Sequence, residues 1–183
     1  MDKLWSTTLR HLDEGNFTAL ENALGGPDGF RDRLIEWYEG GHFAEEVVAL
    51  AEAFSCACML GNVEMAAFFL DKGVDPYAGM KTGLSGFHYA ASSGQLDVIK
   101  LLIERGVPME VKSMYDGTVF DQAIWSAVHE YTPRHAEIVE RLIQAGAFVE
   151  SSYREWWNEQ AVPDAETKRR VAKALEEHND SAT

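Results

Sequence analysis

The feature that most constrains this chain is the spacing of its glycines. Gly61 lies 33 residues before Gly94 (94 − 61), and Gly73 lies 33 residues before Gly106 (106 − 73). Two glycine positions that recur together at one interval indicate a repeated structural unit. A repeat of this length cannot bury its own apolar face, so the sequence predicts that each copy is stabilised by its neighbours.

The copy between residues 83 and 112 predicts a pair of short helices. One runs from Phe87 to Ser93 and the other from Leu96 to Arg105, with Gly94 breaking the chain between them and Gly106 ending the second. The second helix carries an apolar stripe wider than one short partner helix can cover, made of Val98, Ile99, Leu101, Leu102 and Ile103.

The same pattern appears before and after this copy. The earlier copy places Met65, Phe68, Phe69 and Leu70 at the apolar positions, and the later copy places Ile138, Val139, Leu142 and Ile143 there. The later copy is longer, because Gly106 and Gly146 are 40 residues apart (146 − 106), seven more than the repeat. The added residues fall within WSAVHEYTPRHAE, where Pro133 prevents one continuous helix.

At these positions the chain resembles the ankyrin-repeat family, whose motif begins Gly-x-Thr-Pro-Leu-His-x-Ala. The central copy matches it at Gly83, Ser85, Phe87, His88 and Ala90, with Gly86 in place of the proline. The next copy matches it at Thr118, Phe120 and Ala123, with Val119 in place of the proline and Asp121 in place of the histidine. The resemblance covers roughly residues 44 to 150 and implies a structural role for His88.

We therefore expect an all-α fold, an ankyrin-repeat solenoid of helix-turn-helix units with short finger loops, forming a single domain over residues 1–183. Residues 1–43 are expected to form a divergent N-terminal cap with an extra helix at about 28–38, which departs from the family pattern. Residues 44–150 would hold three repeats. Residues 151–183 would form a helical C-terminal cap, split at Pro163, with Trp156 and Trp157 covering the end of the third repeat.

The formal net charge of −14, from 30 acidic and 16 basic residues, argues against nucleic acids and anionic membranes as partners. The N-terminus has no apolar signal core, and no run approaches the roughly 18 apolar residues of a membrane span. Cys56 and Cys58 are two residues apart on one helix, a spacing that favours neither a disulfide nor a shared metal. We expect a reduced, cytoplasmic setting and a monomer.

The densest group of potentially reactive side chains lies in or beside the added residues of the third repeat. These residues are Asp121, His129, Glu130, His135 and Glu137. The six-residue interval between the two histidines matches no metal-ligand pattern such as HExxH, and phosphate-binding glycine motifs are absent. The sequence therefore predicts no cofactor, metal or catalytic residue, although a small-molecule or metal-dependent site in this loop stays open as an alternative.

The resemblance implies a non-enzymatic protein–protein interaction module that binds a partner on the concave side, through finger tips and first-helix faces. By register the candidate contact residues are Tyr77, Lys81, Thr82, Leu84, Ser92, Ser93, Met114, Tyr115, Trp125, Ser126 and His129. The acidic charge leaves a second alternative, an inhibitor that mimics a polyanion. For Trp125 two interpretations stay open: the inserted loop buries the ring through Tyr131 and Pro133, or the ring is an accessible anchor.

Overall fold

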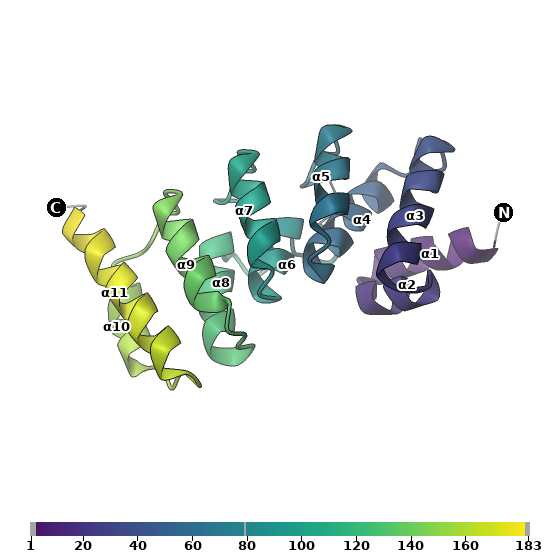
Figure 1. The fold of residues 1–183 in the computed structure, drawn as a ribbon. Helices are drawn as coiled ribbons and strands as arrows, with labels where there is room; N and C mark the ends of the chain where they lie inside the picture. The colour runs from purple at the N-terminus through teal and green to yellow at the C-terminus, as the bar shows by residue number, and fades with distance from the viewer. Residues whose placement is uncertain (1–2, 79, 182–183) are drawn as a thin grey trace. The chain divides into compact units, whose positions relative to one another are not determined.

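The computed structural model describes residues 3–78 and 80–181, and within them it contains helices and loops but no β-strand (Figure 1). This confirms the predicted all-helical repeat fold. The helices in order are α1 (Lys3–Glu14), α2 (Phe17–Ala23), α3 (Gly26–Glu39), α4 (Val47–Leu60), α5 (Val63–Asp71), α6 (Gly86–Ser92), α7 (Leu96–Glu104), α8 (Val119–His129), α9 (His135–Gln144), α10 (Ser152–Glu159) and α11 (Ala165–Ser181). Contacts within the chain divide it into two compact units after Tyr89, inside α6.

The first unit is built around α4, which packs on α1, α2 and α5. Because these helices surround it, α4 is buried on all sides from Ala51 to Cys58. Cys56 and Cys58 are both free thiols within this buried run, and burial raises the pKa of each thiol above its ordinary value. Both are core residues.

The extra helix of the N-terminal region is α3, which begins with Pro27 in its first turn and closely follows the predicted range. Its apolar side packs against the other helices of the first unit. The Trp37 ring contacts the Trp5 ring of α1 edge to face, with ring centroids 5.0 Å apart. Tyr38 meets Phe68 of α5 in the same way at 5.4 Å. The apolar side of α3 is therefore used in packing within this unit.

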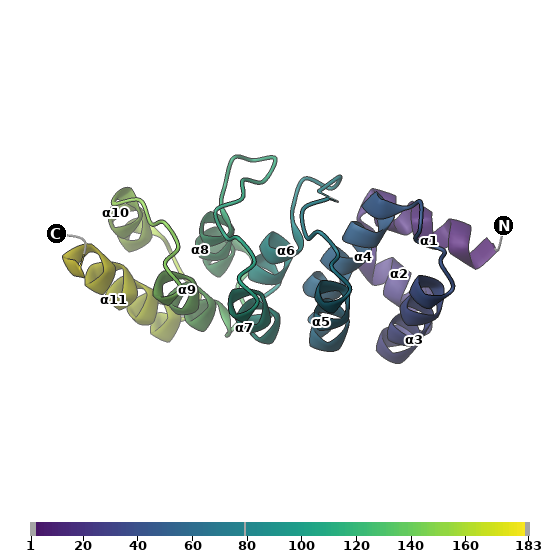
Figure 2. The same cartoon turned by 90° about the horizontal axis from the view of Figure 1, so that it is seen from above.

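In the second unit α9 is the central helix, because it packs on α7, α8 and α11. Figure 2 shows α7, α9 and α11 in a row, with the loop between α7 and α8 projecting on the other side, next to α8. Leu102 and Leu142 are fully buried, as the apolar stripe predicted. Leu101 is only half-buried, so the buried side of α7 is centred on Leu102.

The C-terminal helices α10 and α11 are joined at Pro163 and pack on each other. Trp157 is fully buried, and its indole Nε1 donates a hydrogen bond to the Lys168 carbonyl at 3.0 Å. The Lys168 ammonium in turn donates to the carbonyl oxygens of Trp157, Asn158 and Gln160, which lie at the C-terminal end of α10. Burial lowers the pKa of Lys168. Trp157 thus fixes the cap, whereas Trp156 is half-buried.

The burial difference between two neighbouring leucines gives a matched test of this packing. We predict that Leu102→Ala lowers the free energy of unfolding by about 2–5 kcal/mol, because it leaves a cavity in a fully buried site. Leu101→Ala is the control and should cost clearly less, since its side chain already meets solvent. Urea unfolding measures both changes. Equal losses for the two variants would contradict the assigned orientation of α7.

Candidate functional site

The turn that precedes α6 follows the expected ankyrin arrangement. His88 is fully buried, and its Nδ1 accepts hydrogen bonds from the Ser85 hydroxyl at 2.7 Å and from the Ser85 amide at 3.3 Å. A Cβ at Gly86 would lie 2.7 Å from Cε1 of Phe54. The approach of the Phe54 ring explains why glycine stands where the family motif has proline.

The first helix of the third repeat, α8, also begins with hydrogen bonds between two residues three positions apart, and here aspartate replaces histidine. The Thr118 amide donates to Asp121 Oδ2 at 2.7 Å, and the Asp121 amide donates to Thr118 Oγ1 at 3.2 Å. This capping box satisfies two amides at the start of α8. The other oxygen of Asp121 accepts from the Tyr153 hydroxyl at 2.6 Å. Asp121 is therefore occupied in fixing α8 to α10.

The inserted residues of the third repeat end in a third turn of this kind, formed by Thr132, Pro133, Arg134 and His135. The Thr132 amide donates to His135 Nδ1 at 2.9 Å, and the opposite ring nitrogen, Nε2, lies 3.1 Å from the Ala91 carbonyl oxygen and 3.2 Å from that of Ser92. His135 is fully buried, and burial lowers its pKa. A neutral ring with the proton on Nε2 satisfies all three contacts.

This loop also approaches the turn between α6 and α7. A Cβ at Gly94, where φ is +72°, would lie 2.2 Å from Thr132 Oγ1, so the glycine leaves room for the threonine. The tetrapeptide Thr-Pro-Arg-His resembles the family motif Thr-Pro-Leu-His, and this was the signal available in the sequence. The inserted loop is therefore held in place by a motif-like turn at its end.

The five reactive-looking residues of this region do not converge. Asp121 and His135 are engaged as above, Glu130 accepts from Ser126 at 3.3 Å, and Glu137 pairs with Lys100 at 3.4 Å. The fifth, His129, stacks on a tryptophan ring, as described next. Across residues 3–78 and 80–181, no three His, Cys, Asp or Glu side chains form a group that could hold a metal ion.

Trp125 lies on the solvent-exposed face of α8 and is 44% exposed. The inserted loop therefore leaves the ring accessible, and the accessible interpretation of Trp125 fits the structure. Its ring stacks on the His129 imidazole, with centroids 4.3 Å apart and planes 14° from parallel. His129 Nδ1 also lies 2.9 Å from the Trp125 carbonyl oxygen, so both side chains are held in place. Ser126 is different: it is fully buried, and a partner could not contact its side chain.

The second finger, between α7 and α8, carries the most exposed apolar side chains of the predicted set. Met114 is 66% and Tyr115 75% exposed at its tip. The tip is closed by hydrogen bonds from the Asp116 amide to the Ser113 carbonyl at 3.0 Å and from the Ser113 amide to the Gly117 carbonyl at 2.9 Å. A defined turn therefore presents these two side chains to solvent.

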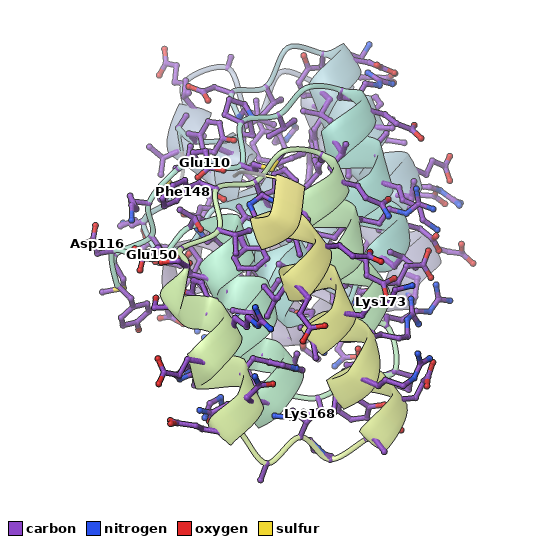
Figure 3. The ribbon with its side chains drawn as sticks, turned by 90° about the vertical axis from the view of Figure 1, so that its left-hand side faces the viewer. Glu110, Asp116, Phe148, Glu150, Lys168 and Lys173 are labelled. Atoms are coloured by element: carbon purple, nitrogen blue, oxygen red, sulfur yellow. The ribbon has the colours of Figure 1, made fainter. Side chains whose placement is uncertain are left out.

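A further exposed aromatic residue, Phe148, lies in the loop after α9 and was missed by the sequence reasoning. It is 66% exposed, and its amide donates to Glu110 Oε1 of the second finger at 2.9 Å. Figure 3 shows Phe148 on the same side of this unit as Glu110, Asp116 and Glu150. A signal was present: the position two residues after the repeat glycine is Asp75, Pro108 and Phe148 in successive copies.

The predicted contact residues of the first finger, in the other unit, are held more closely. Lys81 forms an ion pair with Asp13, and its amide donates to Glu52 Oε1 at 2.7 Å. Glu52 is nearly fully buried, and burial raises its pKa. Thr82, Leu84 and Tyr77 are half-buried, and burial, assisted by Asp75, raises the pKa of Tyr77. Ser92 and Ser93 belong to the second unit and are also half-buried. The Ser92 carbonyl oxygen contacts His135 Nε2.

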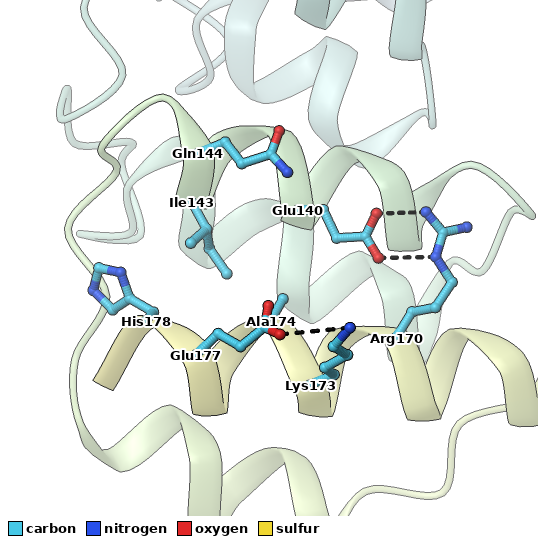
Figure 4. Close-up of a pocket in the computed structure, with 8 residues that line it drawn as sticks. All are labelled: Glu140, Ile143, Gln144, Arg170, Lys173, Ala174, Glu177 and His178. Carbon is cyan, nitrogen blue, oxygen red and sulfur yellow. Dashed lines mark hydrogen bonds and ion pairs between the residues drawn. The ribbon is translucent and has the colours of Figure 1, made fainter. Parts of the chain in front are cut away.

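A hollow of about 480 Å³ lies between α9 and α11, and its lining residues all belong to these two helices (Figure 4). Its charged groups are paired, because Arg170 binds Glu140 through two hydrogen bonds of 2.8 and 2.5 Å, and Lys173 lies 3.5 Å from Glu177. The residues that line it include His178 but no serine, threonine or cysteine. The hollow thus lacks the hydroxyl or thiol nucleophile of a Ser-His or Cys-His pair.

With the turns and the exposed surface described, comparison with known proteins places the chain in a family. Residues 54–153 match the family described as "Ankyrin repeats (3 copies)", and the chain belongs to this family. Such repeats are generally protein–protein interaction modules and are typically non-enzymatic. Among the described residues, no helix combines the length and the apolar composition that a membrane span requires.

Two curated relatives, both from Caenorhabditis elegans, match part of the chain. It is 34% identical to "E3 ubiquitin-protein ligase hecd-1" over 94 residues, 49% of this chain. It is 41% identical to "Ankyrin repeat and KH domain-containing protein mask-1" over 90 residues, 40% of this chain. The matched region covers only 3% of each relative's length, so the likeness concerns the repeat region alone.

The buried ring of His135 makes a pH-dependent prediction. Because its pKa is lowered in the folded state, its contribution to stability is present above the unfolded value of about 6.5 and is lost as pH falls below it. We expect His135→Gln to lose about 1–3 kcal/mol of unfolding free energy at pH 8, through the lost hydrogen bonds. The difference from the natural chain should shrink between pH 7 and 5.5. Urea unfolding at several pH values measures it, and a constant difference would contradict a buried neutral ring.

Proposed function

We propose that this protein is a non-enzymatic interaction module that binds a protein partner through the finger and α8 surface of its second unit. The observation that carries the proposal is the exposure of four large apolar side chains there. These are Met114, Tyr115, Trp125 and Phe148. In the same unit the other large apolar side chains of the helices are buried or half-buried. The exposed large apolar side chains of this unit therefore lie only in its described loops and on the solvent-exposed face of α8.

Exposed aromatic side chains supply much of the energy of protein association when a partner buries them. Tryptophan and tyrosine are enriched among the residues that dominate interface energy. Trp125 is already held by its stack on His129, which lowers the conformational entropy that binding would cost. The hydrogen-bonded turn that contains Tyr115 also lowers the conformational entropy that binding would cost. The surface is thus both apolar and preorganised, as an interaction site requires.

The enzyme alternative receives less support from the same geometry. A site in the inserted loop would need His129 or His135 to face a substrate, but His135 bonds to backbone groups and His129 is stacked on Trp125. The mimicry of a polyanion also receives less support, because many carboxylates form ion pairs along the helices with neighbouring arginines and lysines. We therefore favour the interaction module.

Trp125→Ala tests the proposal by affinity capture from native lysate, with the bound proteins identified by mass spectrometry. We expect the partner that the natural chain captures to bind this variant at least about 30-fold more weakly, a loss of more than about 2 kcal/mol. Unfolding stability should change little, since the ring is partly exposed.

Val48→Ala is the matched control, because Val48 is similarly exposed at 47% but lies on α4 of the first unit. It should leave capture unchanged. Capture of the same proteins in equal amounts by the natural chain and by both variants would contradict the proposed surface.

A further inference from the structure

We infer that the partner segment is a cationic peptide, rich in arginine and carrying at least one large apolar side chain, and that the finger patch binds it. The finger patch consists of the apolar residues Met114, Tyr115 and Phe148 with the carboxylates of Glu110, Asp116 and Glu150. This inference rests on the proposed function and adds the chemistry of the partner.

The finger patch is one structural feature because its two loops are joined. The Phe148 amide donates to Glu110 Oε1 at 2.9 Å, which ties the loop between α9 and α10, the third finger, to the base of the second finger. The second finger is itself fixed to the start of α8, where the Val119 amide donates to the Met109 carbonyl at 3.3 Å. The apolar side chains of both fingers are therefore presented from a connected support.

The charges of the finger patch are unbalanced. Between residues 109 and 117 and between 147 and 151 there are three carboxylates, on Glu110, Asp116 and Glu150, and one ammonium, on Lys112. The Lys112 ammonium donates to the Asp116 backbone carbonyl at 2.8 Å, so it is directed at the backbone of the finger. The finger patch consequently favours a positively charged partner, and it disfavours nucleic acids and anionic lipids.

Arginine suits this mixture of side chains better than lysine. Its planar guanidinium can bind a carboxylate through two parallel hydrogen bonds and can also lie against an aromatic face. Both kinds of group are exposed here, since Tyr115 precedes Asp116 at the finger tip and Phe148 lies two residues before Glu150. An apolar side chain of the partner would then contact the rings themselves.

The test selects binders of the full-length chain from a displayed library of random 12-residue peptides and measures their affinities by fluorescence anisotropy. We expect the selected peptides to be enriched in arginine together with aromatic or aliphatic residues. Raising the salt concentration from 50 to 300 mM should weaken their binding, because exposed charges are screened.

Asp116→Asn with Glu150→Gln removes two charges without changing side-chain size, and asparagine tolerates the positive φ of 62° at position 116. This double variant should bind the selected peptides at least about 10-fold more weakly. The control, Asp97→Asn with Glu104→Gln, removes two charges from α7 in the same unit and should leave the affinity within about twofold.

The outcomes separate this inference from the proposed function. Selected peptides that are neutral or acidic, yet lose affinity with Tyr115→Ala or Phe148→Ala, would overturn the cationic inference and leave the interaction surface standing. Peptides whose binding is unaffected by Trp125→Ala, Tyr115→Ala and Phe148→Ala would overturn both. A library that yields no binder would overturn the inference that the partner is a short peptide segment.

Discussion

The structure depends on the hydrogen-bonded turns that begin its short helices. A helix of seven residues such as α6 forms too few internal hydrogen bonds to persist alone, so it needs both a fixed start and neighbours to pack on. The Ser85–His88, Thr118–Asp121 and Thr132–His135 turns satisfy backbone amides at the starts of α6, α8 and α9, respectively. His135 does more, because its other ring nitrogen reaches the preceding repeat. The Thr132–His135 turn thus both begins α9 and holds the third repeat to the preceding one.

Most of the fold was predictable because glycine spacing and apolar periodicity report directly on local backbone geometry. The 33-residue interval located α4 to α7 and their turns, and Pro133 and Pro163 correctly divided the helices around them. The role of the inserted residues was less accessible, since it depends on His135 reaching Ala91 and Ser92, a contact between residues more than 40 positions apart. We also expected Leu101 to lie in the core with Leu102, but Leu101 is half-buried, because an apolar stripe gives the orientation of α7 only to within about one residue.

The candidate site was predictable in outline, from the resemblance, but not in its detail. Register selected Met114, Tyr115 and Trp125, and these three side chains are exposed. It also selected Ser126, whose burial follows from its place on the inner side of α8, and Lys81, whose pairing with Asp13 is a contact between distant residues. Phe148 was not selected, although it occupies the position of Asp75 and Pro108 in the earlier copies. At the tip of the second finger, the exposed side chains and the residues whose backbone hydrogen bonds close the turn are different residues.

The central claim is that the fingers and α8 of the second unit, rather than its α9 and α11 side, contact the partner. Hydrogen–deuterium exchange of the full-length chain, with and without a saturating peptide from the selection, measures this at the level of individual segments. We expect added protection within residues 109–130 and 146–151, and little change in α9 and α11, which lie on the side away from the second finger (Figure 2). Protection confined to α9, α11 and the hollow between them would contradict it.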